Sequence, residues 1–346
     1  MHRREVLLGL AAAALPLRAR AQTGPVFAAA TIEGERHGIA LLSRDGEILH
    51  HLLLPGRGHD VTASPDGRWI VAFARRPGTF ALATSPAGDA PHVFTAPEGR
   101  HFYGHGVFSP DGRLLIATEN DYENARGVLG LYDATDGFAR IGEWDTHGIG
   151  PHDLNLMPDG RTLVVANGGM DTHPDYGREI LNLPTMEPSV VFLDAGDGHL
   201  IERHTLPAAW SQHSTRHMDL LPDGSVFVGC QWQGAMADCP PMLLRFRKGE
   251  GQAAIGLGAE AEAAFRGYVG SVATNPGAGT VAITSPHGDV AAIVDGVSGK
   301  LLSLRHQADV CGVAWDGADF ITSDGAGHFG ARAHPGLVFD NHIFRL

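Results

Sequence analysis

The sequence predicts an all-β protein, a seven-bladed β-propeller, and composition and repeats support this. Of the 346 residues, 46 are Gly and 21 are Pro, whereas only 19% are charged. This composition suits many short strands joined by tight turns. A strand–turn–strand phrase recurs at intervals of about 40 to 65 residues, the spacing of propeller blades. No segment after the N-terminus has a convincing helical period.

The recurring phrase is a Pro-Asp-Gly turn between two apolar strands. The proline presets φ and the glycine accepts a left-handed conformation, so the turn suits a tight hairpin. Strong copies span residues 61–73, 107–118, 154–166 and 218–229, and weaker copies begin at Val272 and Val313. These copies give six starts of inner strands.

The first blade is expected to obtain its inner strand from the end of the chain. Residues 26–54 contain three apolar stretches but no Pro-Asp-Gly start, and residues 341–346 resemble the missing strand. We therefore predict seven blades, with the C-terminal strand completing the first. Such closure removes the free sheet edges that an open array of blades would leave.

The N-terminus has the features of an export signal. An arginine pair at positions 3 and 4 precedes an apolar run over residues 6–17, and an A-x-A cleavage site precedes Gln22. The run is too short for a membrane span, so we expect its removal and no stable span afterwards. The arginines favour the twin-arginine route, with ordinary secretion as the alternative. The prediction is a signal peptide over 1–21 and a propeller over 22–346, located in the periplasm.

Charge and cysteine content narrow the function. The net charge of -13 argues against a nucleic-acid partner, which requires a basic surface, and is compatible with attracting cations. Of the three cysteines, Cys230 and Cys239 are close enough in sequence to form a disulfide in an oxidising compartment. Cys311 is then the odd thiol.

Histidines occupy equivalent positions in most of the predicted blades. The slot just before the inner strand holds histidine in five blades and cysteine in a sixth, namely His59, His105, His152, His217, His342 and Cys311. Blades are related by rotation, so these side chains should form a ring at one channel mouth. Such ligands suit a transition metal, for which we expect iron or copper. Asp60 and Asp153 would orient the ligands or bind directly. The alternative is a structural histidine, hydrogen-bonded within its own blade.

The loops after the second strands should emerge on the same face as the ring, and they are rich in polar residues. The opposite face carries only plain turns, so the polar face is where a binding site is expected. The insert over residues 167–189 would cover the channel mouth as a lid, or simply cap a blade. Arg178 can bind an anion through its planar guanidinium. The predicted ligand-binding or lid residues are Glu119, Asn120, Asn167, His173, Asp175 and Arg178.

Several of these stretches resemble a family of exported bacterial propellers of unknown function, domain-of-unknown-function family 1513. The resemblance covers nearly the whole mature chain, and its most specific motif is Thr-His-Pro-Asp-Tyr-Gly-Arg at 172–178. Met170 departs from the branched aliphatic residue usual in the family. Members tend to be encoded beside imelysin-type and other iron-uptake proteins. The resemblance therefore implies a role in periplasmic iron acquisition, with such proteins as partners, and it implies no established chemistry.

Three functions are compatible with these features of the sequence. The first is a periplasmic metal-binding protein. The second is a lactonase-like hydrolase in which His152, Glu119 and Arg178 would serve as base, acid and anion clamp. The third is a non-catalytic platform for protein interactions. The sequence leaves open whether the protein is an enzyme.

Overall fold

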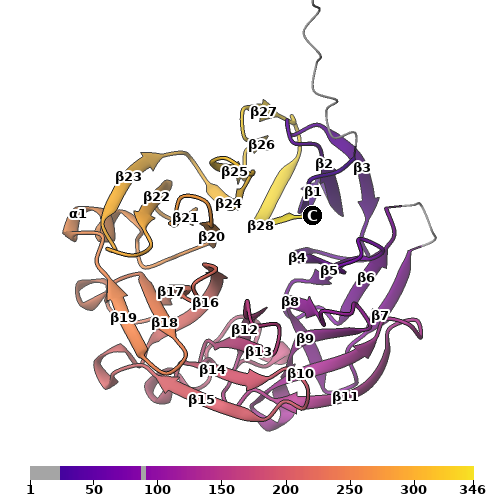
Figure 1. The fold of residues 1–346 in the computed structure, drawn as a ribbon, viewed down its shortest axis with the longest axis horizontal. Coiled ribbons are helices and arrows are strands. Elements are labelled where there is room, and N and C mark those ends of the chain that lie inside the picture. Colours follow the sequence, from indigo (N-terminus) through magenta and orange to yellow (C-terminus); the bar gives the residue numbers. More distant parts are fainter. Residues whose placement is uncertain (1–23, 87–90) are drawn as a thin grey trace, which may run out of the picture.

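Seven four-stranded antiparallel sheets form a closed ring in the computed structural model, which describes residues 24–86 and 91–346 (Figure 1). The predicted seven-bladed propeller is confirmed. The predicted signal peptide, residues 1–21, lies outside the described residues. Within the described part of the chain, none of the helices has the length and apolar character needed to cross a membrane.

The strands follow one another from the channel outward in six of the blades. Blades two to four contain β4 (Gly58–Ala63), β5 (Ile70–Ala74), β6 (Phe80–Thr84) and β7 (His92–Thr95); β8 (Arg100–Phe108), β9 (Leu114–Asp121), β10 (Arg126–Asp133) and β11 (Ala139–Asp145); and β12 (Pro151–Leu156), β13 (Thr162–Asn167), β14 (Ser189–Asp194) and β15 (Leu200–Thr205). Blades five to seven contain β16 (His213–Leu220), β17 (Val226–Trp232), β18 (Leu243–Arg247) and β19 (Gly251–Ile255); β20 (Ser271–Asn275), β21 (Thr280–Ser285), β22 (Val290–Asp295) and β23 (Leu301–His306); and β24 (Val310–Trp315), β25 (Phe320–Asp324), β26 (His328–Phe329) and β27 (Arg332–Ala333).

The first blade joins the two ends of the chain. It contains β28 (Val338–Arg345), β1 (Phe27–Glu33), β2 (Arg36–Leu42) and β3 (Ile48–Leu53). The C-terminal strand β28 pairs antiparallel with β1, with Phe27 opposite Arg345. This confirms the predicted closure. The helical elements are short connections: α1 (Ala259–Ala264) and 3-10 turns at Tyr122–Asn124, Pro174–Tyr176, Leu183–Thr185, Ala208–Trp210 and Met236–Asp238.

The Pro-Asp-Gly turns close the hairpins between first and second strands through local hydrogen bonds. In the second blade, Ser64 Oγ donates to Asp66 Oδ1 at 2.6 Å, and the Trp69 N–H donates to Ser64 Oγ at 2.9 Å. Gly67 has φ +69°, which only glycine adopts without strain. The turn thus fixes where the inner strand ends and where the second strand begins.

The hydrophobic core lies between neighbouring blades. Between the second and third blades, for example, Phe73 and Phe94 pack against Phe102 and Tyr132, and the Phe73 and Phe102 ring centres are 5.7 Å apart. Burial of each such side chain contributes about 1.5–3 kcal/mol. Because this packing repeats around the ring, it holds the inner strands at a fixed distance from the axis.

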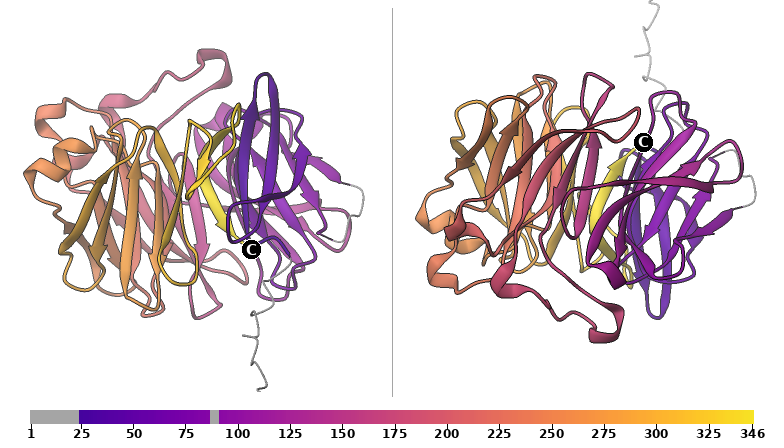
Figure 2. Two further views of the ribbon diagram at one scale, coloured as in Figure 1. Left: turned by 90° about the horizontal axis from the view of Figure 1, so that it is seen from above. Right: turned by 90° about the horizontal axis from the view of Figure 1, so that it is seen from below.

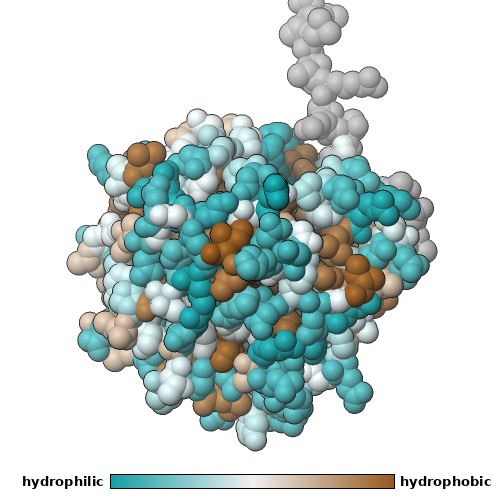
Figure 3. All heavy atoms as spheres, turned by 60° about the horizontal axis from the view of Figure 1, so that its bottom comes forward, coloured by the Kyte–Doolittle hydropathy of each residue, from teal (hydrophilic) through white to brown (hydrophobic). Residues whose placement is uncertain are grey.

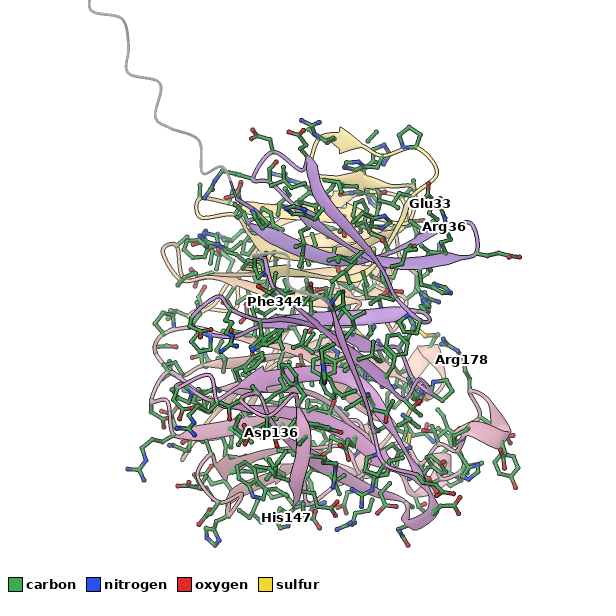
Figure 4. The ribbon with its side chains drawn as sticks, turned by 90° about the vertical axis from the view of Figure 1, so that its right-hand side faces the viewer. Glu33, Arg36, Asp136, His147, Arg178 and Phe344 are labelled. Carbon is green, nitrogen blue, oxygen red and sulfur yellow. The ribbon has the colours of Figure 1, made fainter. Side chains whose placement is uncertain are left out.

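The two faces of the propeller differ. The segment between β13 and β14 projects from one face (Figure 2). Arg178 of this segment lies on the same face as the β1–β2 hairpin, marked by Glu33 and Arg36 (Figure 4). Hydrophilic residues predominate on the surface seen in Figure 3, where apolar residues form small separate groups.

Candidate metal centre

The five ring histidines all lie in irregularities of the innermost strands. The pairing register of β4 with β5 shifts between Gly58 and Val61, around His59, and that of β8 with β9 shifts between Phe102 and Gly106, around His105. Equivalent shifts enclose His152 and His217, and His342 lies between Phe339 and Ile343, where β28 shifts against β1. A bulge turns its extra residue out of the regular pleat, so it can aim a side chain at the axis. The β20–β21 pairing is regular, and its slot holds no histidine.

The bulges bring the five imidazoles together. In nine of the ten ring pairs, the ring-centre distances range from 4.4 Å, between His217 and His342, to 6.1 Å, between His59 and His217. A metal-bound imidazole has its ring centre about 3 Å from the ion, so two rings on one ion are separated by about 4–6 Å. The observed spacing falls in this range. The nitrogens form two groups that could hold a metal ion, one of His59, His105 and His342 and one of His105, His152 and His217, with ligand atoms within 4.8 Å of one another.

Each of the five rings has a buried nitrogen with no hydrogen-bond partner among residues 24–86 and 91–346. These atoms are His59 Nδ1, His105 Nε2, His152 Nε2, His217 Nδ1 and His342 Nε2. His59 Nδ1 does lie 3.7 Å from Asp340 Oδ1, which is an ion-pair distance but too long for a hydrogen bond. An unsatisfied buried polar atom costs about 1–3 kcal/mol, so native proteins keep few of them. Five such atoms, gathered in two groups that share His105, fit the requirements of a metal site.

Four of the imidazoles are held neutral, the state that a metal ligand requires. Burial lowers the pKa of His59 to about 3. Burial, with neighbouring positive charges, lowers the pKa values of His152, His217 and His342 well below 6.5. Each of these side chains therefore keeps one ring nitrogen with a lone pair at neutral pH.

His105 differs because two carboxylates approach it. Its Nδ1 lies 3.0 Å from Asp60 Oδ2 and 3.4 Å from Asp153 Oδ1. Burial lowers the pKa of His105, but these carboxylates outweigh burial and the net shift is upward. A hydrogen bond from Nδ1 to Asp60 fixes the ring and leaves Nε2 free, as is usual for metal-binding histidines.

His152 is already engaged by a buried arginine. Arg216 Nη1 donates to His152 Nδ1 at 3.1 Å, so neutral His152 carries its hydrogen on Nε2. Arg216 is only 7% exposed, and burial lowers its pKa to about 10. The second group therefore has a cation beside it, which opposes metal binding there.

Cys311, expected in the ring, lies outside both histidine groups. The register shift in β24 turns its thiol against β28, where Sγ lies 3.5 Å from the Phe339 carbonyl oxygen and 3.3 Å from that of Asp340. Burial raises the pKa of the Cys311 thiol to about 12, so it stays protonated. Cys230 and Cys239 are also free thiols.

Three of the expected loop residues form hydrogen bonds or ion pairs with other residues of the propeller. The buried Glu119 carboxylate accepts from the Tyr132 hydroxyl at 2.6 Å and pairs with Arg140 at 3.0 Å. Asn120 donates to the Thr172 carbonyl at 3.0 Å, and Asn167 donates to the Thr146 carbonyl at 2.9 Å. A carboxylate paired in this way is poorly placed to act as the acid of a lactonase.

The remaining lid residues belong to the segment that projects from the polar face. His173 Nδ1 accepts from the Asp175 N–H at 3.2 Å, and His173 Nε2 lies 3.5 Å from Glu123 Oε1. The Asp175 side chain is exposed. Arg178 lines a small cavity beside the histidines.

The histidine centre separates two cavities of opposite charge. The larger, about 510 Å³, extends toward the Pro-Asp-Gly turns and is lined by the carboxylates of Asp60, Asp153 and Asp219. The smaller, about 100 Å³, lies on the lid side and is lined by four arginines: Arg75, Arg76, Arg178 and Arg216. Of these four, only Arg178 was predicted from the sequence. The other three could have been predicted from their positions in the sequence. Arg75 and Arg76 follow the second strand of a blade, and Arg216 directly precedes a ring histidine.

Comparisons with known proteins agree with the fold. The family model DUF1513, described as a protein of unknown function, matches residues 52–346. No curated protein matches the sequence. Among solved structures, hydrazine synthase of Kuenenia stuttgartiensis is similar with a TM-score of 0.61 and 14% identity, over 84% of this chain and 87% of that chain. At this identity the likeness concerns the fold alone.

Proposed function

The chain belongs to the DUF1513 family of proteins of unknown function, and from this premise we propose that it is a periplasmic protein that binds iron or copper at its histidine centre and serves iron acquisition. The observation that carries the metal proposal is the convergence of five buried imidazole nitrogens without hydrogen-bond partners among the described residues. Most buried polar atoms in proteins have a hydrogen-bond partner, so five such nitrogens in one cluster favour a ligand that completes them.

The group of His59, His105 and His342 is the better metal site of the two. None of its three histidines accepts a hydrogen bond from an arginine among the described residues, and His59 Nδ1 lies 3.7 Å from a carboxylate, Asp340 Oδ1. The other group includes His152, whose Nδ1 already accepts from Arg216. His217, with its ring centre 4.4 Å from that of His342, is the candidate for a fourth ligand.

The larger cavity supports a route for a cation to the histidines. Its lining includes Asp60, Asp153 and Asp219, and Arg345 is the only arginine or lysine among its lining residues in the described chain. Carboxylates in a concave, partly buried site attract cations and raise their local concentration. A metal ion would therefore enter from the face of the Pro-Asp-Gly turns.

The metal and the pathway are supported by chemistry and by family resemblance. Imidazole nitrogen suits iron and copper, and also zinc and nickel. The role in iron acquisition follows from the resemblance to exported propellers encoded beside iron-uptake proteins, which are the proposed partners. The periplasmic location follows from the predicted signal peptide, and mass spectrometry of the exported protein should find a chain beginning at Gln22.

Elemental analysis of protein purified from the periplasm without a histidine tag tests the metal proposal. The wild-type protein should retain iron or copper, and the double variant His105→Gln/His342→Gln should lose it. His50→Gln/His306→Gln is the matched control, because it removes two exposed histidines far from the centre. Equal metal content in all three proteins would refute the proposal. The metal-free double variant should unfold within a few degrees of the metal-free wild type, and a large loss of stability would favour a structural role for these histidines.

A further inference from the structure

The small cavity on the lid side contains positive charge that the protein itself does not neutralise. Arg75 pairs with Asp340 at 2.8 Å. In contrast, no carboxylate among residues 24–86 and 91–346 lies within salt-bridge distance of Arg76, Arg178 or Arg216. Within the described part of the chain, the Arg76 guanidinium donates one hydrogen bond, to the Thr172 hydroxyl at 3.3 Å.

Arg216 is the strongest sign of a missing anion. Its side chain is more than nine-tenths buried, yet its contacts are neutral: the His152 ring at 3.1 Å and the Met170 sulfur at 3.4 Å. Its Nε has no hydrogen-bond partner among the described residues. A buried charge without a counter-charge is strongly unfavourable, so proteins keep one only where something compensates it.

We propose that the lid-side cavity is a binding site for a small oxyanion, a carboxylate or a phosphate, held by Arg216, Arg76 and Arg178. Guanidinium groups bind such oxyanions through paired N–H donors. The cavity of about 100 Å³ suits an ion of that size. Tyr103 and Tyr268 also line it, and their hydroxyls can donate to the same anion.

The position of the cavity connects the anion with the metal, and this step rests on the proposed function. His59, His152 and His217 line the cavity together with the arginines. An oxyanion there would lie beside the ion and can supply an oxygen ligand. Metal and anion would then raise each other's affinity by the same factor, since coupling between two sites is reciprocal.

Calorimetric titration of the metal-free protein tests the anion site separately from the metal. Inorganic phosphate and oxalate are the probes, at an ionic strength held constant with chloride. We expect saturable binding of at least one probe to a single site. Arg76→Gln and Arg178→Gln should each weaken it about tenfold, the loss expected for one charge-assisted contact. Arg161→Gln is the matched control, because Arg161 is an exposed arginine in a Pro-Asp-Gly turn on the opposite face.

The outcomes separate the two proposals. Binding of neither probe, or an equal loss in Arg161→Gln, would overturn the anion site even if the protein binds metal. Anion binding without any metal binding would support this inference and refute the metal centre. Arg216→Lys keeps the positive charge but loses the paired N–H donors of the guanidinium. It should therefore weaken anion binding while the protein stays folded. If the protein binds both ligands, an unchanged metal affinity in saturating anion would overturn their coupling.

Discussion

Replacing Asp60 by asparagine should weaken metal binding about 10- to 100-fold, the range measured when a partner of a ligand histidine is removed. The substitution keeps the shape of the side chain but removes the charge that lies 3.0 Å from His105 Nδ1. This carboxylate fixes the ring with Nε2 toward the centre and increases the basicity of that nitrogen. The expected loss corresponds to about 1.4–2.7 kcal/mol of binding free energy.

The assay is a competition titration of the metal-free protein against a chromophoric chelator at pH 7. Glu35→Gln is the matched control, since it removes one exposed carboxylate at a hairpin tip. Its affinity should stay within about twofold of the wild type, because an exposed charge at a distance is screened by salt. If Asp60→Asn binds as tightly as the wild type while His105→Gln does not, the proposed orienting role of Asp60 is refuted.

Three further predictions concern the scaffold and the thiol. Hydrogen bonding from Arg100 and other arginines lowers the pKa of Glu143 to about 2. Glu143 therefore stabilises the fold above pH 4.5, and this stabilisation is lost as the pH falls toward 2. Denaturant unfolding of Glu143→Gln should show a loss of stability on the order of 1–3 kcal/mol at pH 7 and almost none near pH 2. Gly104 has φ +107° and a Cβ there would lie 2.4 Å from the His59 ring, so Gly104→Ala should destabilise the protein by about 2–4 kcal/mol. Gly34→Ala, with φ +61° and no atom within 4 Å, should cost about 1–2 kcal/mol, and an equal effect of the two would show that the His59 contact is unimportant. Cys311→Ser should leave metal affinity within about twofold of the wild type, and a tenfold loss would place this thiol among the ligands.

The sequence was sufficient for the fold and for the set of histidines. The Pro-Asp-Gly turns can be recognised from local sequence, because the hydrogen bonds that close the hairpin lie within the turn, as at Ser64 and Asp66. Repetition of this hairpin at blade spacing predicts several similar blades arranged around one axis. Equivalence by rotation then brings together residues as distant as His59 and His342, whose ring centres lie 4.7 Å apart. None of these steps depends on the detailed packing of a side chain.

The direction of a side chain at a bulge could not be read from the sequence. Cys311 occupies a slot equivalent to those of the histidines, but its bulge directs the thiol to the carbonyl oxygens of β28. Glu119 was expected to be available to a ligand, but Arg140 and Tyr132 bind it within the blade. The partners in both cases come from other strands, so no local pattern could reveal them.

The rotational symmetry of a propeller explains the ring but not the chemistry of the two sides. A symmetric ring would place equivalent charges around the axis, whereas here Asp60 and Asp153 lie toward one cavity and Arg76 and Arg216 toward the other. Asp60, Asp153 and Arg216 are adjacent to ring histidines in the sequence, whereas Arg76 follows the second strand of its blade. This polarity argues against the histidines as a mere wet channel lining, because a lining needs no separation of charge. It is the arrangement expected where a cation and an anion approach one centre from opposite faces.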